Sequence, residues 1–204
     1  MDKYQILKQY FGYDDFRQGQ LTAIDSILSG TDTMAIMPTG GGKSICFQVP
    51  AMMFRGITIV ISPLISLMND QVRALSQCGI PAAYLNTSLD DKVITRVIDE
   101  VSQGKYKIIY VAPERLLTQS FKRLCNKVEV SFIAIDEAHC VSQWGQDFRP
   151  GYLDIKEFIA SFKKRPVVAA FTATATSIVK KDICNLLGLI NPEEIATGFD
   201  RENL

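Results

Sequence analysis

The chain has 204 residues, of which 47% are hydrophobic and 22% are charged, enough to bury the core of one domain. Its formal net charge is zero, so no global electrostatic sign of nucleic-acid binding exists, and any such contact must come from a local patch. The only histidine is His139, which excludes a metal site built from several histidines and leaves one candidate base for a Ser-His-Asp triad.

The sequence contains no recognisable targeting segment. The N-terminus mixes acidic, basic and aromatic residues instead of placing a basic segment before an apolar one, and no apolar run reaches the length of a membrane span. The five cysteines lack a paired metal-ligand spacing and are interpreted as buried thiols of a reducing compartment. We therefore expect a cytoplasmic protein without membrane contact.

Short apolar runs alternate with segments of helical spacing along the chain. The runs have the character of buried strands and cover residues 33–37, 57–62, 82–85, 107–111, 132–136 and 167–172. Between and after them, apolar residues recur at helical spacing, for example over 65–75, 93–101 and 179–187. This alternation predicts an α/β fold, in which helices cover both faces of a mainly parallel sheet and ligands bind at the carboxyl ends of its strands.

One globular domain is expected over residues 1–197. Residues 191–194 (Asn-Pro-Glu-Glu) are typical of a turn, and no repeat or Pro/Gly-rich linker interrupts the chain before them. Residues 198–204 show no helical period and are expected to form a connector.

A glycine-rich segment follows the first predicted strand and consists of Thr39, Gly40, Gly41, Gly42, Lys43 and Ser44. Glycines let the backbone curl its N–H groups around phosphate oxygens, Lys43 neutralises phosphate charge, and the Ser44 hydroxyl can ligate Mg²⁺. Met37 stands where the commonest P-loop has its first glycine, and Pro50 predicts a kinked or short helix after the loop. A glycine-rich turn formed for packing alone is the alternative.

An acidic pair ends the fifth predicted strand. Asp136 is placed to hold the Mg²⁺ shell, and Glu137 can orient and deprotonate an attacking water. Both motifs follow strands, and the carboxyl ends of parallel strands meet at one edge of a sheet. Together they predict a site that binds and hydrolyses a magnesium nucleotide.

The order of motifs resembles superfamily-two helicases, in which a P-loop is followed by Asp-Glu-Ala-His and Thr-Ala-Thr, here residues 136–139 and 172–174. Further stretches are similar to the RecQ family of DNA helicases: residues 11–13 with Phe16, Arg17 and Gln20, residues 62–67, residues 112–116 and the pair Trp144-Gly145. The resemblance runs nearly end to end. It implies a RecA-like P-loop NTPase domain, the first of two such domains in an ATP-dependent DNA helicase.

Adenine recognition is implied for the segment ahead of the P-loop. By the resemblance, Tyr13 stacks on the base, Gln20 bonds its N6/N7 edge and Arg17 assists. A glutamine amide matches the donor and acceptor of that edge, and a tyrosine ring offers a stacking face. Alternatively, Tyr13 belongs with Phe11 and Phe16 to the core aromatics of an N-terminal helix and turn, an interpretation that we favour for the two phenylalanines.

An aromatic segment after Asp-Glu-Ala-His carries the only tryptophan of the chain. In RecQ-like proteins such a loop senses single-stranded DNA and couples it to ATP hydrolysis. Trp144 and Phe148 offer flat faces to bases, and Arg149 can meet phosphate or stack. A loop whose aromatics cap the core is the alternative.

Two further segments follow predicted strands and resemble motifs that grip one DNA strand by its backbone. Ser62 and Pro63 belong to the first and Arg115 to the second. Small hydroxyls and free helix-start N–H groups suit phosphate contact without sequence specificity. Residues 86–88 (Asn-Thr-Ser) fit DNA contact and a cap of the helix from Leu89 equally well, and the basic groups 163–165 and 180–181 are interpreted as solvated helix ends.

The resemblance assigns His139, Thr172 and Thr174 to a relay between the nucleotide state and the grip on DNA. Small hydroxyls and an imidazole can form such a chain of hydrogen bonds. Alternatively, the two threonines end a strand and cap the helix from Ser177.

The sequence thus predicts the ATP-binding half of a DNA helicase that uses ATP and Mg²⁺ to move on one strand and unwind duplexes, with 3′ to 5′ motion and genome maintenance implied by the family. Single-stranded DNA, duplex junctions and a second RecA-like domain in the parent chain are the expected partners. Because the family's catalytic arginine comes from that second domain, we expect this chain alone to hydrolyse ATP hardly at all. An RNA helicase domain and a non-catalytic nucleic-acid-binding module on an NTPase scaffold are the alternatives.

Overall fold

The computed structural model describes residues 1–145 and 147–197. The connector expected over residues 198–204 therefore lies outside the described residues. The strands are β1 (Thr33–Ile36), β2 (Ile57–Ile61), β3 (Ala82–Leu85), β4 (Ile108–Val111), β5 (Val130–Ile135), β6 (Val167–Thr172) and β7 (Glu193–Ala196). The α-helices are α1 (Lys3–Ile6), α2 (Gln20–Leu28), α3 (Lys43–Met53), α4 (Ile65–Gln77), α5 (Asp91–Ser102), α6 (Gln119–Lys127), α7 (Asp154–Ala160) and α8 (Ser177–Leu187). A π-helical turn, η1 (Leu7–Phe11), and the 3-10 turns η2 (Pro113–Arg115), η3 (Ala138–Val141) and η4 (Pro150–Leu153) complete the elements.

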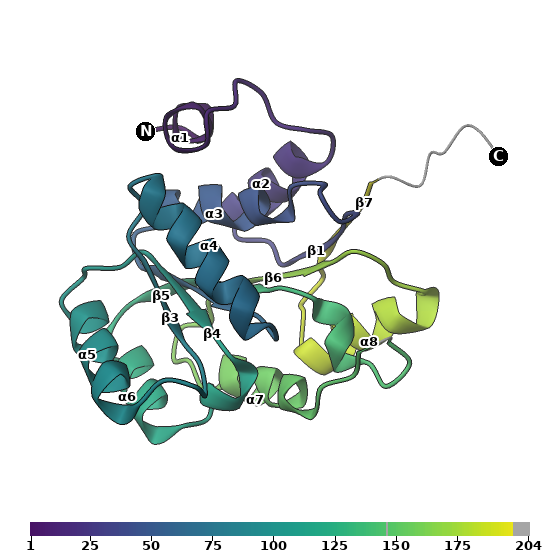
Figure 1. Ribbon diagram of the computed structural model, residues 1–204. Helices are drawn as coiled ribbons and strands as arrows, with labels where there is room; N and C mark the ends of the chain where they lie inside the picture. The colour runs from purple at the N-terminus through teal and green to yellow at the C-terminus, as the bar shows by residue number, and fades with distance from the viewer. Residues whose placement is uncertain (146, 198–204) are drawn as a thin grey trace.

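In the described part of the chain, the seven strands form one sheet of order β3-β4-β2-β5-β6-β1-β7, and every pairing is parallel (Figure 1). Strands β1, β2 and β4 are buried along their whole length, as expected of strands covered on both faces. The predicted α/β class and the six predicted strands are confirmed, with small differences at strand ends.

Alternate residues of the strands pack into two separate cores. Ala35 and Phe171 face a core shared with α2, α3 and α4, whereas Met34 and Ala170 face a core shared with α5, α6, α7 and α8. Figure 1 shows these two groups of helices on opposite sides of the sheet. The side-chain period of a strand thus produces the three-layer architecture.

The strand order brings the two nucleotide motifs together. Strand β6 lies between β1 and β5, so the loop after β1 and the acidic pair after β5 leave the same edge of the sheet. Adjacent strands are about 4.8 Å apart, which separates β1 from β5 by about 10 Å. That spacing is short enough for one nucleotide to touch both loops.

Three predictions need correction. Residues 191–194 are not only a turn, because Glu193 and Glu194 begin the edge strand β7, in which Ile195 alone is buried. Arg165 is no solvated helix end, since its guanidinium pairs with the buried carboxylate of Asp32. Cys78 is exposed rather than buried.

None of the helices in the described ranges has the length and apolar character that a membrane crossing requires.

Candidate active site

The glycine-rich loop opens the N-terminus of α3. Gly40 and Gly42 adopt left-handed φ angles of 77° and 81°, which glycine reaches without steric cost. Gly42 caps α3 without a side-chain hydrogen bond, so the first N–H groups of the helix have no side-chain acceptor at the cap. Such a helix end favours an anion.

Lys43 is the first residue of α3 and bends back over the loop. Its Nζ donates a hydrogen bond to the Met37 carbonyl oxygen at 3.1 Å. The Met37 side chain is buried in the core, and its backbone is not in the left-handed region. Glycine is therefore not needed at this position, which accounts for the departure from the commonest P-loop.

The acidic pair follows β5 directly. The Asp136 N–H donates to the Ile61 carbonyl at 2.8 Å, and the Asp136 carbonyl accepts from the Tyr152 hydroxyl at 2.8 Å. Glu137 adopts a left-handed φ of 47°, a conformation that costs a non-glycine residue about 1–3 kcal/mol. Both carboxylates are consequently aimed by backbone geometry rather than by flexible side chains alone.

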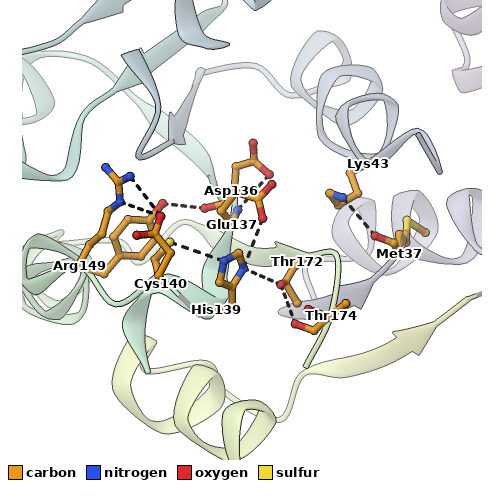
Figure 2. Close-up of polar contacts among 11 residues, drawn as sticks. Met37, Lys43, Asp136, Glu137, His139, Cys140, Arg149, Thr172 and Thr174 are labelled. Carbon is orange, nitrogen blue, oxygen red and sulfur yellow. Dashed lines mark hydrogen bonds and ion pairs between the residues drawn. The ribbon is translucent and has the colours of Figure 1, made fainter. Parts of the chain in front are cut away.

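Electrostatics couple the two motifs. Burial, followed by the charge of Glu137, raises the pKa of Asp136 to about 6, and the nearby Lys43 ammonium acts in the opposite direction. In Figure 2, Lys43 of α3 lies beside the carboxylates of Asp136 and Glu137. The lysine and the acidic pair are thus neighbours at one edge of the sheet, although the Lys43 ammonium is bonded to the Met37 carbonyl rather than to either carboxylate.

A cavity of about 290 Å³ extends from the loop towards the N-terminal segment. Tyr13, Arg17 and Gln20 line it together with Gly40, Gly42, Lys43 and Ser44. Thr39 is exposed on the loop outside this lining. The residues that sequence analysis assigned to adenine and phosphate are therefore neighbours in space.

The aromatics of the N-terminal segment divide as expected. Phe11 and Phe16 are half-buried against the cluster of Ile6, Leu7, Ile24 and Val49, which confirms their structural role. Tyr13 is 52% exposed, so it is not a core aromatic and its ring remains accessible for stacking.

Gln20 supports the glycine-rich loop through hydrogen bonds that the sequence did not predict. It is buried, its Nε2 donates to the Gly42 carbonyl at 3.1 Å, and its Oε1 accepts from the Arg17 N–H at 2.8 Å. A Cβ on Gly42 would collide with this amide. Arg17 adds a hydrogen bond to the Gly40 carbonyl at 2.8 Å, so the N-terminal segment positions the loop as well as lining the cavity.

The predicted relay residues form one chain of contacts (Figure 2). His139 Nδ1 lies 3.3 Å from the Glu137 carboxylate and 3.0 Å from the Thr172 hydroxyl, which in turn donates to the Thr174 carbonyl at 3.0 Å. Thr172 does end β6, but the cap of α8 is Thr176, not Thr174. The capping alternative is therefore wrong for Thr174.

The aromatic segment presents one of its aromatic rings to solvent. Trp144 is 76% exposed and Phe148 is half-buried, so the alternative of a core cap is wrong for the tryptophan. Arg149 is not free, because its guanidinium bonds the Asp147 carboxylate at 3.1 Å and the Pro63 carbonyl at 2.8 Å. In this structure it ties the segment to the end of β2.

The two predicted backbone-gripping segments are less accessible than expected. Ser62 and Pro63 are buried, because they follow β2, which lies between β4 and β5. Contact between the Ser62 hydroxyl and DNA is thus not possible in this conformation. Arg115 is half-buried and donates from Nε to the Asn86 carbonyl at 3.0 Å. Asn86 accepts from the Ser88 N–H at 2.9 Å, while Asp90 caps α5, so residues 86–88 do not cap that helix.

Comparison with known proteins decides the family. The model of the DEAD/DEAH box helicase family matches residues 17–182. The chain belongs to the DEAD/DEAH box helicases. This helicase domain is 50% identical over 200 residues to the ATP-dependent DNA helicase RecQ of Bacillus subtilis (strain 168), which confirms the resemblance to RecQ. It is 45% identical over 204 residues to the putative ATP-dependent RNA helicase R290 of Acanthamoeba polyphaga mimivirus.

The helicase domain spans about a third of the length of these curated relatives. The alignments cover 98% of the chain in both cases, but 34% of RecQ and 36% of R290. The crystal structure of the DUF1998 helicase MrfA bound to DNA matches with a TM-score of 0.77 at 17% identity, over 97% of this chain and 29% of that one. This likeness confirms the helicase fold.

Two positioning contacts of the helicase domain lie outside the sequence motifs. Tyr152 in η4 fixes the Asp136 carbonyl, and Asp182 in α8 accepts a hydrogen bond from Ser142. No local pattern marks either residue, since each contact depends on how η4 and α8 pack beside the acidic pair.

Proposed function

We propose that this domain is the ATP-binding half of an ATP-dependent DNA helicase that moves on one strand, 3′ to 5′, and unwinds duplex DNA. The main support is that the strand order brings the loop of Lys43 and the pair Asp136 and Glu137 to one edge of the sheet, beside a helix N-terminus without a side-chain cap. Identity to RecQ supports DNA as the nucleic acid.

The nucleotide fits the cavity along the loop. The triphosphate would lie on the first N–H groups of α3, with Lys43 neutralising its charge and Thr39 to Gly42 shaping the loop. Adenine would enter beside Tyr13, Arg17 and Gln20. In the present conformation the Gln20 amide is bonded to the Gly42 carbonyl and to the Arg17 N–H, so reading the N6/N7 edge of adenine would require this side chain to exchange those bonds for the base.

Magnesium fits the donor set. Ser44 would offer a hydroxyl and Asp136 a carboxylate, and Mg²⁺ takes its remaining ligands from phosphate and water. With only these two side-chain donors, the site would hold the ion together with the phosphates of the nucleotide. When bound, it neutralises charge on the phosphates.

Glu137 is the proposed base for the attacking water. Its left-handed backbone and its contact to His139 fix the carboxylate at the end of β5. A positioned base contributes about 10²–10⁴ in rate. His139, Thr172 and Thr174 would pass the state of this carboxylate towards the DNA-contacting surface.

The DNA side of the proposal rests on exposed groups. Trp144 is accessible for stacking on a base, Phe148 would offer a second, half-buried ring, and Arg149 holds the segment in place. Arg115, which is half-buried and bonded through Nε to the Asn86 carbonyl, would meet backbone phosphate with its remaining N–H groups. Residues 1–197 are proposed as the first of two RecA-like domains, a proposal supported by the aligned part being only 34% of the RecQ relative. Nucleotide turnover would open and close the cleft between the domains.

An RNA helicase is the second candidate, because the relative R290 carries that name. The test compares ATPase stimulation of the full-length protein by single-stranded DNA and by RNA of the same length, with ATP and GTP as substrates. We expect stimulation by DNA and preference for ATP. Equal or greater stimulation by RNA would favour the RNA helicase, and absent turnover with either nucleic acid would favour the non-catalytic module.

A further inference from the structure

We propose that Asp182 of α8 is a positioning residue that anchors the Trp144 segment and couples it to the nucleotide site. This inference rests on the proposed function, because it concerns the same coupling between DNA and turnover. The anchor works through Ser142, which lies between Asp182 and the tryptophan.

The Ser142 hydroxyl is held from both sides. It donates to Asp182 Oδ2 at 2.6 Å and accepts from the Trp144 N–H at 3.1 Å. Ser142 is fully buried, so water does not replace either partner. Because the Ser142 hydroxyl donates its hydrogen to Asp182, a lone pair of the Ser142 oxygen is free to accept from the Trp144 N–H.

The backbone around Ser142 leaves little freedom. The Ser142 N–H donates to the His139 carbonyl at 3.1 Å, and the Gly145 N–H donates to the Ser142 carbonyl at 3.0 Å. A Cβ on Gly145 would collide with the His139 carbonyl oxygen. The turn that carries Trp144 is thus stacked directly on the residue that contacts Glu137.

Apolar packing joins η3 to α8 through Cys140 and Val141, but it does not extend to the tip of the turn at Trp144. A cavity of about 300 Å³ lies between the turn and α8, lined by His139 and Trp144 on one side and by Thr174 and Val179 on the other. The Trp144 ring is 76% exposed and does not fill the core. The hydrogen bond from Ser142 to Asp182 therefore adds a polar link between the buried base of the turn and α8.

Helix α8 receives the other end of the relay. It starts at Ser177, directly after the segment in which Thr174 accepts from Thr172. A shift at Glu137 or His139 that reaches Thr174 would therefore move the start of α8. Through its hydrogen bond to Ser142, Asp182 would pass that movement to Trp144. Asp182 thus connects the carboxylate pair with the exposed tryptophan ring.

The test uses the full-length protein and four variants: Asp182→Ala, Asp182→Asn, Ser142→Ala and the double variant Ser142→Ala/Asp182→Ala. Asp90→Ala is the matched control, because it also removes an aspartate that accepts a hydrogen bond, at the N-cap of α5. The measurements are the concentration of single-stranded DNA that gives half-maximal ATPase, the KM for ATP, and hydrogen exchange of the peptide containing Trp144.

We expect Asp182→Ala to raise the half-maximal DNA concentration about tenfold, as for loss of a charge-assisted hydrogen bond, without changing the KM for ATP. Exchange at Trp144 should become faster. Asp182→Asn keeps an acceptor oxygen and should restore most of the coupling, and the double variant should be no worse than Ser142→Ala, since both changes break one connection.

An Asp182→Ala variant that behaves like Asp90→Ala in all three measurements would overturn the inference, as would a double variant whose losses are fully additive. Should Asp182→Ala fail to fold, Asp182→Asn and Ser142→Ala decide the question by the same readouts. A wild-type protein without DNA-stimulated ATPase would overturn the proposed function instead. Hydrogen exchange at Trp144 would then still decide whether Asp182 anchors the segment.

Discussion

The imidazole Nδ1 of His139 lies 3.0 Å from the hydroxyl of Thr172, which is 33 residues further along the chain. The contact joins the end of β5 to the end of β6, and the Glu137 carboxylate lies 3.3 Å from the same nitrogen. The proposed water-activating group and the segment leading into α8 are therefore connected by side chains within hydrogen-bond range. The central strands hold both ends in register.

Thr172→Val tests this connection. Valine keeps the shape of the buried side chain and removes the hydroxyl, so we expect little change in nucleotide affinity but about tenfold weaker stimulation of ATPase by DNA. Thr58→Val is the matched control, because Thr58 is also buried in the sheet and its hydroxyl has no hydrogen-bond partner in the described ranges. Equal stimulation of the two variants would contradict a role for Thr172 in the relay.

Glu137→Gln separates binding from turnover. The amide keeps the size of the side chain but cannot accept a proton from water, so kcat should fall about 10²–10⁴-fold, whereas the Kd for ATP should change little. Glu129→Gln is the control, since Glu129 is exposed at the opposite end of β5. Steady-state ATPase assays give kcat, and isothermal titration calorimetry gives the Kd for ATP. Normal unwinding by Glu137→Gln would refute the assignment.

Trp144→Ala should remove the response to DNA without unfolding the protein. Because the ring is 76% exposed, its loss should change the free energy of unfolding by less than about 0.5 kcal/mol. A stacked base contributes about 1–3 kcal/mol, so DNA binding should weaken at least about fivefold. Ile178→Ala, which also removes an exposed apolar side chain, is the control. Fluorescence anisotropy with labelled single-stranded DNA measures the affinity. Equal binding by the two variants would contradict a stacking role for Trp144.

Arg165→Ala should destabilise the fold. Asp32 is buried and accepts from the Arg165 guanidinium at 2.9 Å, from the Val168 N–H at 3.0 Å and from the Ile190 N–H at 2.8 Å. Removing the partner of a buried carboxylate costs about 3–5 kcal/mol, and because Arg165 is partly exposed we expect about 2–3 kcal/mol. Urea unfolding should show no such loss for the neighbouring Lys164→Ala, whose side chain is exposed.

The parallel sheet was predictable because its strands are continuous apolar runs. That signal is absent from β7, where Glu193, Glu194 and Ala196 are exposed and only Ile195 reaches the core. Helices α6 and α7 were also missed. They are short, and each places only two or three residues in the core, for example Phe121 and Leu124 of α6.

The candidate site likewise contains residues that motifs locate and contacts that only the tertiary packing determines. Motif spacing located Lys43, Asp136 and Glu137, because the carboxyl ends of strands gather at one edge whatever the details of packing. Burial of Ser62 and the pairing of Arg149 with Pro63 depend on which strands flank β2, and the sequence does not state the strand order. Gln20 as a support of the glycine loop and Asp182 as a partner of Ser142 are likewise tertiary contacts without a local signature.

A crystal structure with Mg²⁺ and a non-hydrolysable ATP analogue tests the central claim most directly. We expect the triphosphate on the N-terminus of α3 in contact with Lys43, and the metal ion between the Ser44 hydroxyl and the Asp136 carboxylate, with Glu137 facing the terminal phosphate. A triphosphate bound away from α3, or a metal ion that touches neither Ser44 nor Asp136, would contradict the account.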